Sequence, residues 1–151
     1  MTKVICGFPG TGKSYFARTA TGLVSDSDSS SFSWIQQDGE KVRNPNFPTN
    51  YIDHIKYLID QQYTYVFVST HKDVINALSN SGIEFSIIYP SRELKQEYLD
   101  RYRNRKSPEV FINLLDSKWD EFIDDVESAS VATLIPLKAG QYIQDVLKSL
   151  N

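Results

Sequence analysis

The chain has very little cysteine and little excess charge, and each shortage excludes a class of protein. Its single cysteine, Cys6, excludes an internal disulfide and lies in an apolar run that is typical of a small core side chain. The net charge is −3, so no overall basic field attracts nucleic acid. No apolar run approaches the length of a membrane span, and Lys3 is the only basic residue before Lys13. We therefore expect no signal peptide, no membrane partner and a cytoplasmic location.

Apolar and aromatic residues, in contrast, are plentiful. Hydrophobic residues make up 40% of the chain, with nine tyrosines and eight phenylalanines, which is ample for one core. A length of 151 residues is typical of one domain. We therefore expect a single domain over residues 1–151 and leave open whether it is a monomer or a homodimer.

Residues 7–14 carry the most specific motif. They match G-x-x-x-x-G-K-[ST], the phosphate-binding P-loop, and lie between a predicted strand at 3–6 and a predicted helix at 14–21. Their glycines permit backbone conformations closed to other residues, so successive N–H groups can form an anion nest beside the helix start. Lys13 is expected to reach the β- and γ-phosphates, and the Ser14 hydroxyl to bind Mg²⁺. The residues expected to bind the nucleotide are Gly7, Pro9, Gly10, Thr11, Gly12, Lys13, Ser14 and Tyr15.

The rest of the chain alternates apolar strand-like runs with amphipathic helical segments. This alternation predicts an α/β fold whose five-stranded parallel sheet is covered by helices on both faces. The further strands are expected at 22–25, 65–70, 85–89 and 132–135. Apolar stripes predict helices through 52–59, 74–78, 94–102, 111–126 and 143–150. Ser107 as N-cap and Pro108 at the first helical position are expected to open the fourth of these.

Two carboxylates, Asp26 and Asp28, follow the second predicted strand. Ligands in open α/β sheets lie beyond the carboxyl ends of the strands, so both carboxylates should face the same crevice as the P-loop. One could hold Mg²⁺ through water and the other could accept a proton from a substrate hydroxyl, or they could be turn residues. The third strand ends Ser69-Thr70-His71, without the aspartate that many P-loop proteins place there, which shifts the metal role toward Ser14 and Asp26. His71 is either a polar site residue or a histidine at a helix start, and the pattern favours the second.

Residues 92–106 form a basic helical segment. Arg101 and Arg105 are four residues apart and share one helix face, where two guanidinium groups can grip phosphate oxygens. The alternative is a solvated face on which Glu97 and Arg101 form an intrahelical pair. Both arginines are predicted to stabilise charge during phosphoryl transfer.

Residues 29–50 occupy the place of a substrate-covering segment between the second and third strands. Arg43 could bind a substrate phosphate, and Phe47 or Tyr51 could stack on a base. Trp34 is a further candidate for stacking, as is Phe32. The predicted substrate-binding residues are therefore Arg43, Trp34 and Tyr51.

With these residues in place, the chain resembles the small P-loop kinases of the adenylate, guanylate and shikimate kinase type. Its loop is similar to their G-x-x-G-x-G-K-[ST] form, and Asp26-Ser27-Asp28 resembles the D-x-D element of shikimate and related kinases. The resemblance implies a three-layer P-loop fold with strand order 2-3-1-4-5 and a short lid at about 101–108. It also implies ATP and Mg²⁺ as cofactors and transfer of a phosphoryl group to a nucleoside or nucleoside monophosphate. The catalytic residues that follow from the pattern and the resemblance together are Lys13, Asp26, Asp28, Arg101 and Arg105.

Two alternatives remain open. Residues 105–108 followed by a long amphipathic helix are similar to the end of a polynucleotide 5′-kinase domain, although the net acidity weighs against a nucleic-acid substrate. The chain could instead be a non-catalytic nucleotide-binding module that acts through a partner. The sequence does not identify the acceptor or distinguish ATP from GTP.

Overall fold

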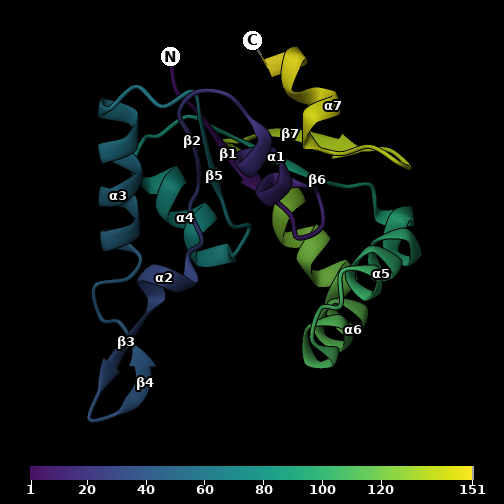
Figure 1. Ribbon diagram of the computed structural model, residues 1–151, viewed down its shortest axis with the longest axis horizontal. Coiled ribbons are helices and arrows are strands. Elements are labelled where there is room, and N and C mark those ends of the chain that lie inside the picture. Colours follow the sequence, from purple (N-terminus) through teal and green to yellow (C-terminus); the bar gives the residue numbers. More distant parts are fainter. Residues whose placement is uncertain (151) are drawn as a thin grey trace.

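Five parallel strands form the central sheet of the molecule. The computed structural model describes residues 1–150, and the side chains of all of these except Ser30, Lys148 and Ser149 (Figure 1). The order across the sheet is β2-β5-β1-β6-β7, and every neighbouring pair is parallel. The strands are β1 (Lys3–Gly7), β2 (Val24–Asp26), β5 (Tyr65–Val68), β6 (Phe85–Pro90) and β7 (Thr133–Leu137). The predicted α/β class, with a five-stranded parallel sheet flanked by helices, is confirmed.

Helices cover both faces of this sheet because successive strand side chains point to opposite sides. In β1, Val4 and Cys6 join one core, whereas Ile5 joins the other. The first core is closed by α3 (Thr49–Asp60), α4 (Lys72–Asn80), α5 (Lys95–Asn104) and α6 (Glu109–Glu127). The second is closed by α1 (Lys13–Thr19), α7 (Ile143–Val146) and the 3₁₀ turn η2 (Leu147–Leu150).

A small second sheet lies in the segment between β2 and α3, for which the sequence analysis predicted no strands. After the short helix α2 (Ser30–Ser33), strands β3 (Trp34–Gln37) and β4 (Glu40–Arg43) pair antiparallel. Asp38 and Gly39 join them with φ values of 54° and 80°, as a two-residue hairpin turn requires. Figure 1 shows this hairpin projecting away from the central sheet.

Helix α6 begins later than the sequence predicted. Pro108 is the N-cap, with an extended ψ of 144°, so Ser107 is not the cap and Pro108 is not the first helical residue. The φ of Pro108, −57°, would suit a helix, but its ψ is extended, so the helix begins one residue later, at Glu109. Lys118 has non-helical angles inside α6, and a 3₁₀ turn, η1 (Arg92–Leu94), precedes α5.

None of the helices in residues 1–150 combines the length and the apolar character that a membrane crossing requires.

Candidate active site

The glycine-rich loop (residues 7–14) joins β1 to α1 at the carboxyl end of the sheet. Gly10 and Gly12 have φ values of 89° and 93°, a region that L residues with a Cβ rarely adopt. Within the described residues, the N–H groups of Gly10, Gly12 and Lys13 donate to no acceptor in the protein. The loop therefore presents several free backbone donors together, which is the arrangement that an anion requires.

Hydrogen bonds from two side chains to backbone carbonyl oxygens of the loop fix its shape. The Thr11 hydroxyl donates to the carbonyl oxygen of Phe8 at 2.7 Å, and the Thr11 N–H donates to the same oxygen at 3.2 Å. The Tyr102 hydroxyl donates to the Pro9 carbonyl oxygen at 2.7 Å. Thr11 was predicted to bind the nucleotide, but its side chain is fully buried and both its donors are used within the loop. Its role is to shape the loop.

Ser14 and Asp26 meet at the edge of the loop. The Ser14 hydroxyl donates to Oδ2 of Asp26 at 2.7 Å, because β2 ends next to β5 and directs Asp26 toward the start of α1. Among the described side chains no group of three or more His, Cys, Asp or Glu residues could hold a metal alone. Mg²⁺ usually takes one or two carboxylates together with substrate phosphates and waters, and a Ser–Asp pair beside a phosphate nest fits that requirement.

Ser27, between the two carboxylates, is held by four hydrogen bonds, one of which joins its hydroxyl to that of Ser25 at 2.7 Å. Its N–H donates to the Phe67 carbonyl oxygen at 2.8 Å, its hydroxyl lies 3.1 Å from Nε2 of His54, and its carbonyl oxygen accepts from the Tyr51 hydroxyl. Tyr51 was predicted to bind the substrate, but its side chain is fully buried. It therefore cannot stack on an acceptor and instead holds the Asp26–Asp28 segment from α3.

The central cavity, of about 260 Å³, unites residues from five parts of the chain. Burial lowers the pKa of Lys13, as does Arg105, while Asp26 and Asp28 raise it. The ammonium group therefore lies in a site of mixed charge, with carboxylates of the β2 end opposite it. The cavity is lined by Gly7, Pro9, Lys13, Ser14, Asp26, Ser27, Asp28, Ser69, Thr70, His71, Arg105 and Phe111.

The outer cavity, of about 460 Å³, lies on the other side of Lys13. It joins the glycine-rich loop to both predicted arginines, Arg101 and Arg105, at the place predicted for a lid. Tyr15 and Tyr142 also line it and are both exposed, so their rings are accessible to a ligand. The Arg105 guanidinium lies 5.0 Å from the Tyr102 ring and its Nε donates to the Ser107 hydroxyl at 3.0 Å.

Arg101 lines the outer cavity, but most of its contacts are with the protein itself. Its guanidinium lies 4.3 Å from the Tyr98 ring and 4.0 Å from the Tyr142 ring, and its side chain is only 12% exposed. It donates to the carbonyl oxygens of Gly10 at 2.7 Å and Gln141 at 3.1 Å, and to Glu97 at 2.8 Å. Since these contacts face the protein, Arg101 supports the loop instead of gripping a phosphate.

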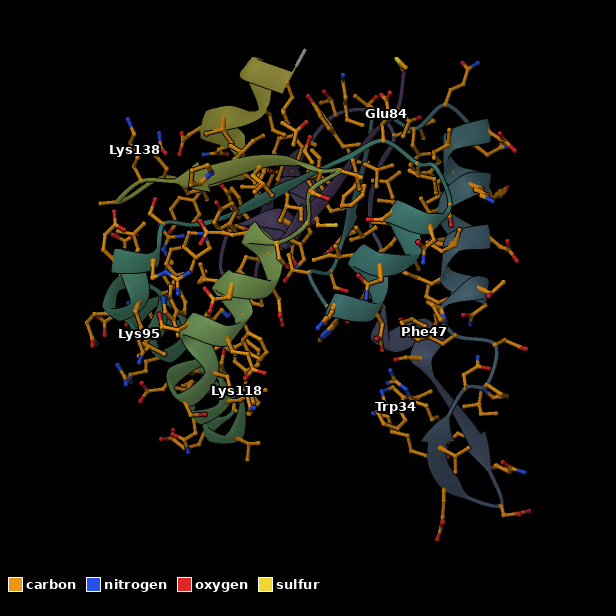
Figure 2. All side chains as sticks on the ribbon, turned by 180° about the vertical axis from the view of Figure 1, so that it is seen from behind. Trp34, Phe47, Glu84, Lys95, Lys118 and Lys138 are labelled. Carbon is orange, nitrogen blue, oxygen red and sulfur yellow. The ribbon has the colours of Figure 1, made fainter. Side chains whose placement is uncertain are left out.

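The hairpin cavity, of about 310 Å³, lies beyond the central cavity. The Arg43 guanidinium lies 5.1 Å from the Trp34 ring and 5.2 Å from the Phe47 ring, and pairs with Asp73 at 3.7 Å. Figure 2 shows Trp34 and Phe47 close to each other, on the opposite side of the molecule from Lys118 of α6. Two of the three predicted substrate residues, Arg43 and Trp34, therefore line one cavity, together with Ser29, Ser33, Phe47, His71, Lys72 and Asp73.

Sequence reasoning favoured a helix-start role for His71 over a site role, and it missed the contact of Tyr142 with Arg101. The backbone of His71 does start α4, because its carbonyl oxygen accepts from Val74 and Ile75 at 3.0 Å. Its imidazole makes no cap hydrogen bond and faces the cavities instead. No local pattern marks Tyr142, which reaches the loop only because the Ile143 N–H donates to the Thr11 carbonyl oxygen at 2.9 Å.

In comparisons with known proteins, no family model matches this chain and no curated protein matches it. We therefore infer its function from the geometry of the site itself.

Proposed function

We propose that the protein is a Mg-ATP-dependent phosphotransferase that acts on a small acceptor, a nucleoside or nucleoside monophosphate. One observation carries the proposal: the central cavity, which contains the Ser14–Asp26 pair and Asp28, shares Lys13, Ser14 and Arg105 with the outer cavity, where Gly10 and Gly12 of the glycine-rich loop lie. Phosphoryl transfer requires a phosphate cradle, a metal position, cations for the equatorial oxygens and a place for the nucleophile. Each of these requirements has a named candidate among the residues of these two adjoining cavities.

The topology supports the proposal. Numbered along the chain, the five strands of the central sheet run 2-3-1-4-5, the order expected for nucleotide kinases. In such a sheet β1 lies in the middle, so the loop that follows it opens at the centre of the crevice. Asp26, at the end of β2, contacts the loop through Ser14, and Asp28 lines the same central cavity as Lys13.

On the donor side, the free backbone donors and Lys13 would hold the phosphates, and Ser14 with Asp26 would hold Mg²⁺. The metal would neutralise charge that develops on the phosphate oxygens. Arg105 is the arginine available for the transferred group, because Arg101 is engaged with the carbonyl oxygens beneath the loop. Tyr15 and Tyr142 offer apolar surface for the nucleobase in the outer cavity.

On the acceptor side, Asp28 faces the central cavity and the hairpin cavity continues from it. Trp34 and Phe47 offer ring surface, and Arg43 and Lys72 offer charge. A flat, polar molecule of nucleoside size suits this combination of rings and hydrogen-bonding groups.

A screen with ATP labelled at the γ-phosphate tests the proposal. The protein is incubated with nucleosides, nucleoside monophosphates and 5′-hydroxyl oligonucleotides, with and without Mg²⁺, and products are separated by thin-layer chromatography. We expect Mg²⁺-dependent label on one class of small acceptor. Label on oligonucleotides alone, with steep salt dependence, would support the polynucleotide kinase instead. Nucleotide binding without any product would support the non-catalytic module.

A further inference from the structure

His71 is the one residue, among those the structure describes, that lines both the central and the hairpin cavity. It follows β5, the neighbour of β1, and is exposed to solvent. Within the described part of the chain its imidazole makes no hydrogen bond, and its backbone alone starts α4. A molecule that occupied both cavities would therefore have to pass the imidazole ring.

Charged groups from four elements of the site influence this imidazole. Partial burial lowers the pKa of His71 below its ordinary value of 6.5. Asp28 raises that pKa, Arg43 lowers it, Asp73 raises it and Lys13 lowers it. Partial burial thus favours the neutral ring, which can accept a proton, and Asp28 favours the charged form once the proton is bound.

Around the proposed acceptor position, the basic and acidic side chains are equal in number. Arg43 is paired with Asp73, which leaves Lys72 on this side and Asp28 opposite it. A dianionic phosphate that served as the nucleophile would be repelled by Asp28, because the cations of the same cavity, Lys13 and Arg105, would be engaged with the phosphates of the donor. A neutral hydroxyl meets no such repulsion, but it must lose a proton when it attacks.

We propose that His71 is a further catalytic residue, the base that takes the proton of an acceptor hydroxyl, and that the acceptor is therefore an alcohol such as a nucleoside; this rests on the proposed function. The acceptor O–H bond breaks and its proton passes to the free ring nitrogen of His71. The oxygen forms the new bond to the γ-phosphorus, the bond from that phosphorus to the β–γ bridging oxygen breaks, and ADP leaves. The resulting imidazolium is stabilised by the Asp28 carboxylate.

The first test compares the wild-type protein with His71→Asn, whose amide cannot take a proton. For the wild type, kcat/KM for the nucleoside should rise with pH through the lowered pKa of His71, below 6.5, and become level above it. The variant should lose about 10²- to 10⁴-fold in kcat and lose that rise, while the KM for ATP stays unchanged. Folding should persist because the bonds that start α4 come from the His71 carbonyl oxygen.

The second test does not depend on turnover. The chain has two histidines, so its imidazole NMR spectrum holds two sets of signals, which a His54→Asn variant assigns. Addition of the nucleoside with Mg²⁺ and a non-hydrolysable ATP analogue should shift the His71 signals far more than those of His54, which lines neither cavity.

The outcomes separate the two proposals. If the protein transfers phosphate but His71→Asn turns over within about threefold of the wild type, His71 is not the base and only this inference fails. Transfer to the phosphate of nucleoside monophosphates, with unmoved His71 signals, also overturns it alone. A protein that transfers phosphate to no acceptor overturns the proposed function and the inference together.

Discussion

The Arg101 guanidinium donates a hydrogen bond to the Gly10 carbonyl oxygen at 2.7 Å, across 91 positions of sequence. Through it the end of α5 holds the glycine-rich loop in place. The same side chain donates to Gln141, while Glu97 accepts from the Gly140 N–H at 3.1 Å. The loop, α5 and the segment before α7 are therefore coupled through one ion pair.

Removal of this arginine should weaken both the fold and the binding of nucleotide. Arg101→Ala leaves the Gly10 and Gln141 carbonyl oxygens without their partner and removes two ring contacts, so we expect a loss of about 2–3 kcal/mol in the free energy of unfolding. The exposed Arg103 pairs with Asp100 at 3.1 Å and is the matched control. Arg103→Ala should change stability by no more than about 0.5 kcal/mol. Urea unfolding of both variants measures the difference, and equal losses would show that Arg101 is a surface residue.

A comparison of Gly12→Ala with Gly22→Ala distinguishes the effect of backbone strain from the effect of a Cβ placed at the ligand site. Both have positive φ, at 93° and 97°, so alanine at either should cost about 1–2 kcal/mol. A Cβ on Gly12 would lie 3.1 Å from the Tyr142 ring, whereas one on Gly22 would meet nothing within 4 Å. Gly12→Ala should therefore lower the affinity for ATP at least about tenfold, and Gly22→Ala should not. Calorimetric titration of the two variants with ATP measures both affinities. A similar loss of affinity in the two variants would contradict a phosphate site at the loop.

Asp26→Asn tests the metal position. The substitution keeps the hydrogen-bonding shape beside Ser14 but removes the charge that would attract Mg²⁺. We expect the Mg²⁺ concentration for half-maximal phosphoryl transfer to rise at least about tenfold, with little change in nucleotide affinity in the absence of metal. Asp60→Asn, at the exposed end of α3, serves as the control. An unchanged Mg²⁺ dependence in Asp26→Asn would place the metal elsewhere.

Trp34 and Ile35 are exposed to a similar extent on β3, at 38% and 39%, but only Trp34 lines the hairpin cavity. Trp34→Ala should raise the KM for the acceptor by about three- to tenfold, because a ring contact is lost, and leave the KM for ATP unchanged. Ile35→Ala should leave both unchanged. If the two variants behave alike, the acceptor does not contact the hairpin.

Most of the central sheet could be predicted because its strands are short, apolar and separated by amphipathic helices. The strand predicted at 65–70 corresponds to β5 and begins at the same residue. The strand predicted at 3–6 corresponds to β1 and ends one residue before it. The hairpin was missed although Asp38-Gly39 is a typical two-residue turn, because its strands are almost entirely exposed and show no apolar alternation.

The site was predictable only where its chemistry is local in sequence. The glycine-rich loop and the carboxylates after β2 follow from short motifs. The burial of Tyr51 and the contacts of Arg101 with the loop were not predicted, because each depends on which side of its helix faces the core. No local pattern places a partner 24 or 91 positions away. The sequence left two roles open for His71 for a similar reason, since its position between two cavities depends on the hairpin.

The most direct test of the account is calorimetric titration of Mg-ATP into the wild-type protein and into Lys13→Ala. The account predicts that one Mg-ATP binds per wild-type chain. It also predicts that removal of the ammonium group weakens this binding by at least about 10²-fold without lowering the melting temperature. A wild-type protein that binds no nucleotide, or a Lys13→Ala protein that binds it equally well, would contradict the claim that the glycine-rich loop is a nucleotide phosphate site.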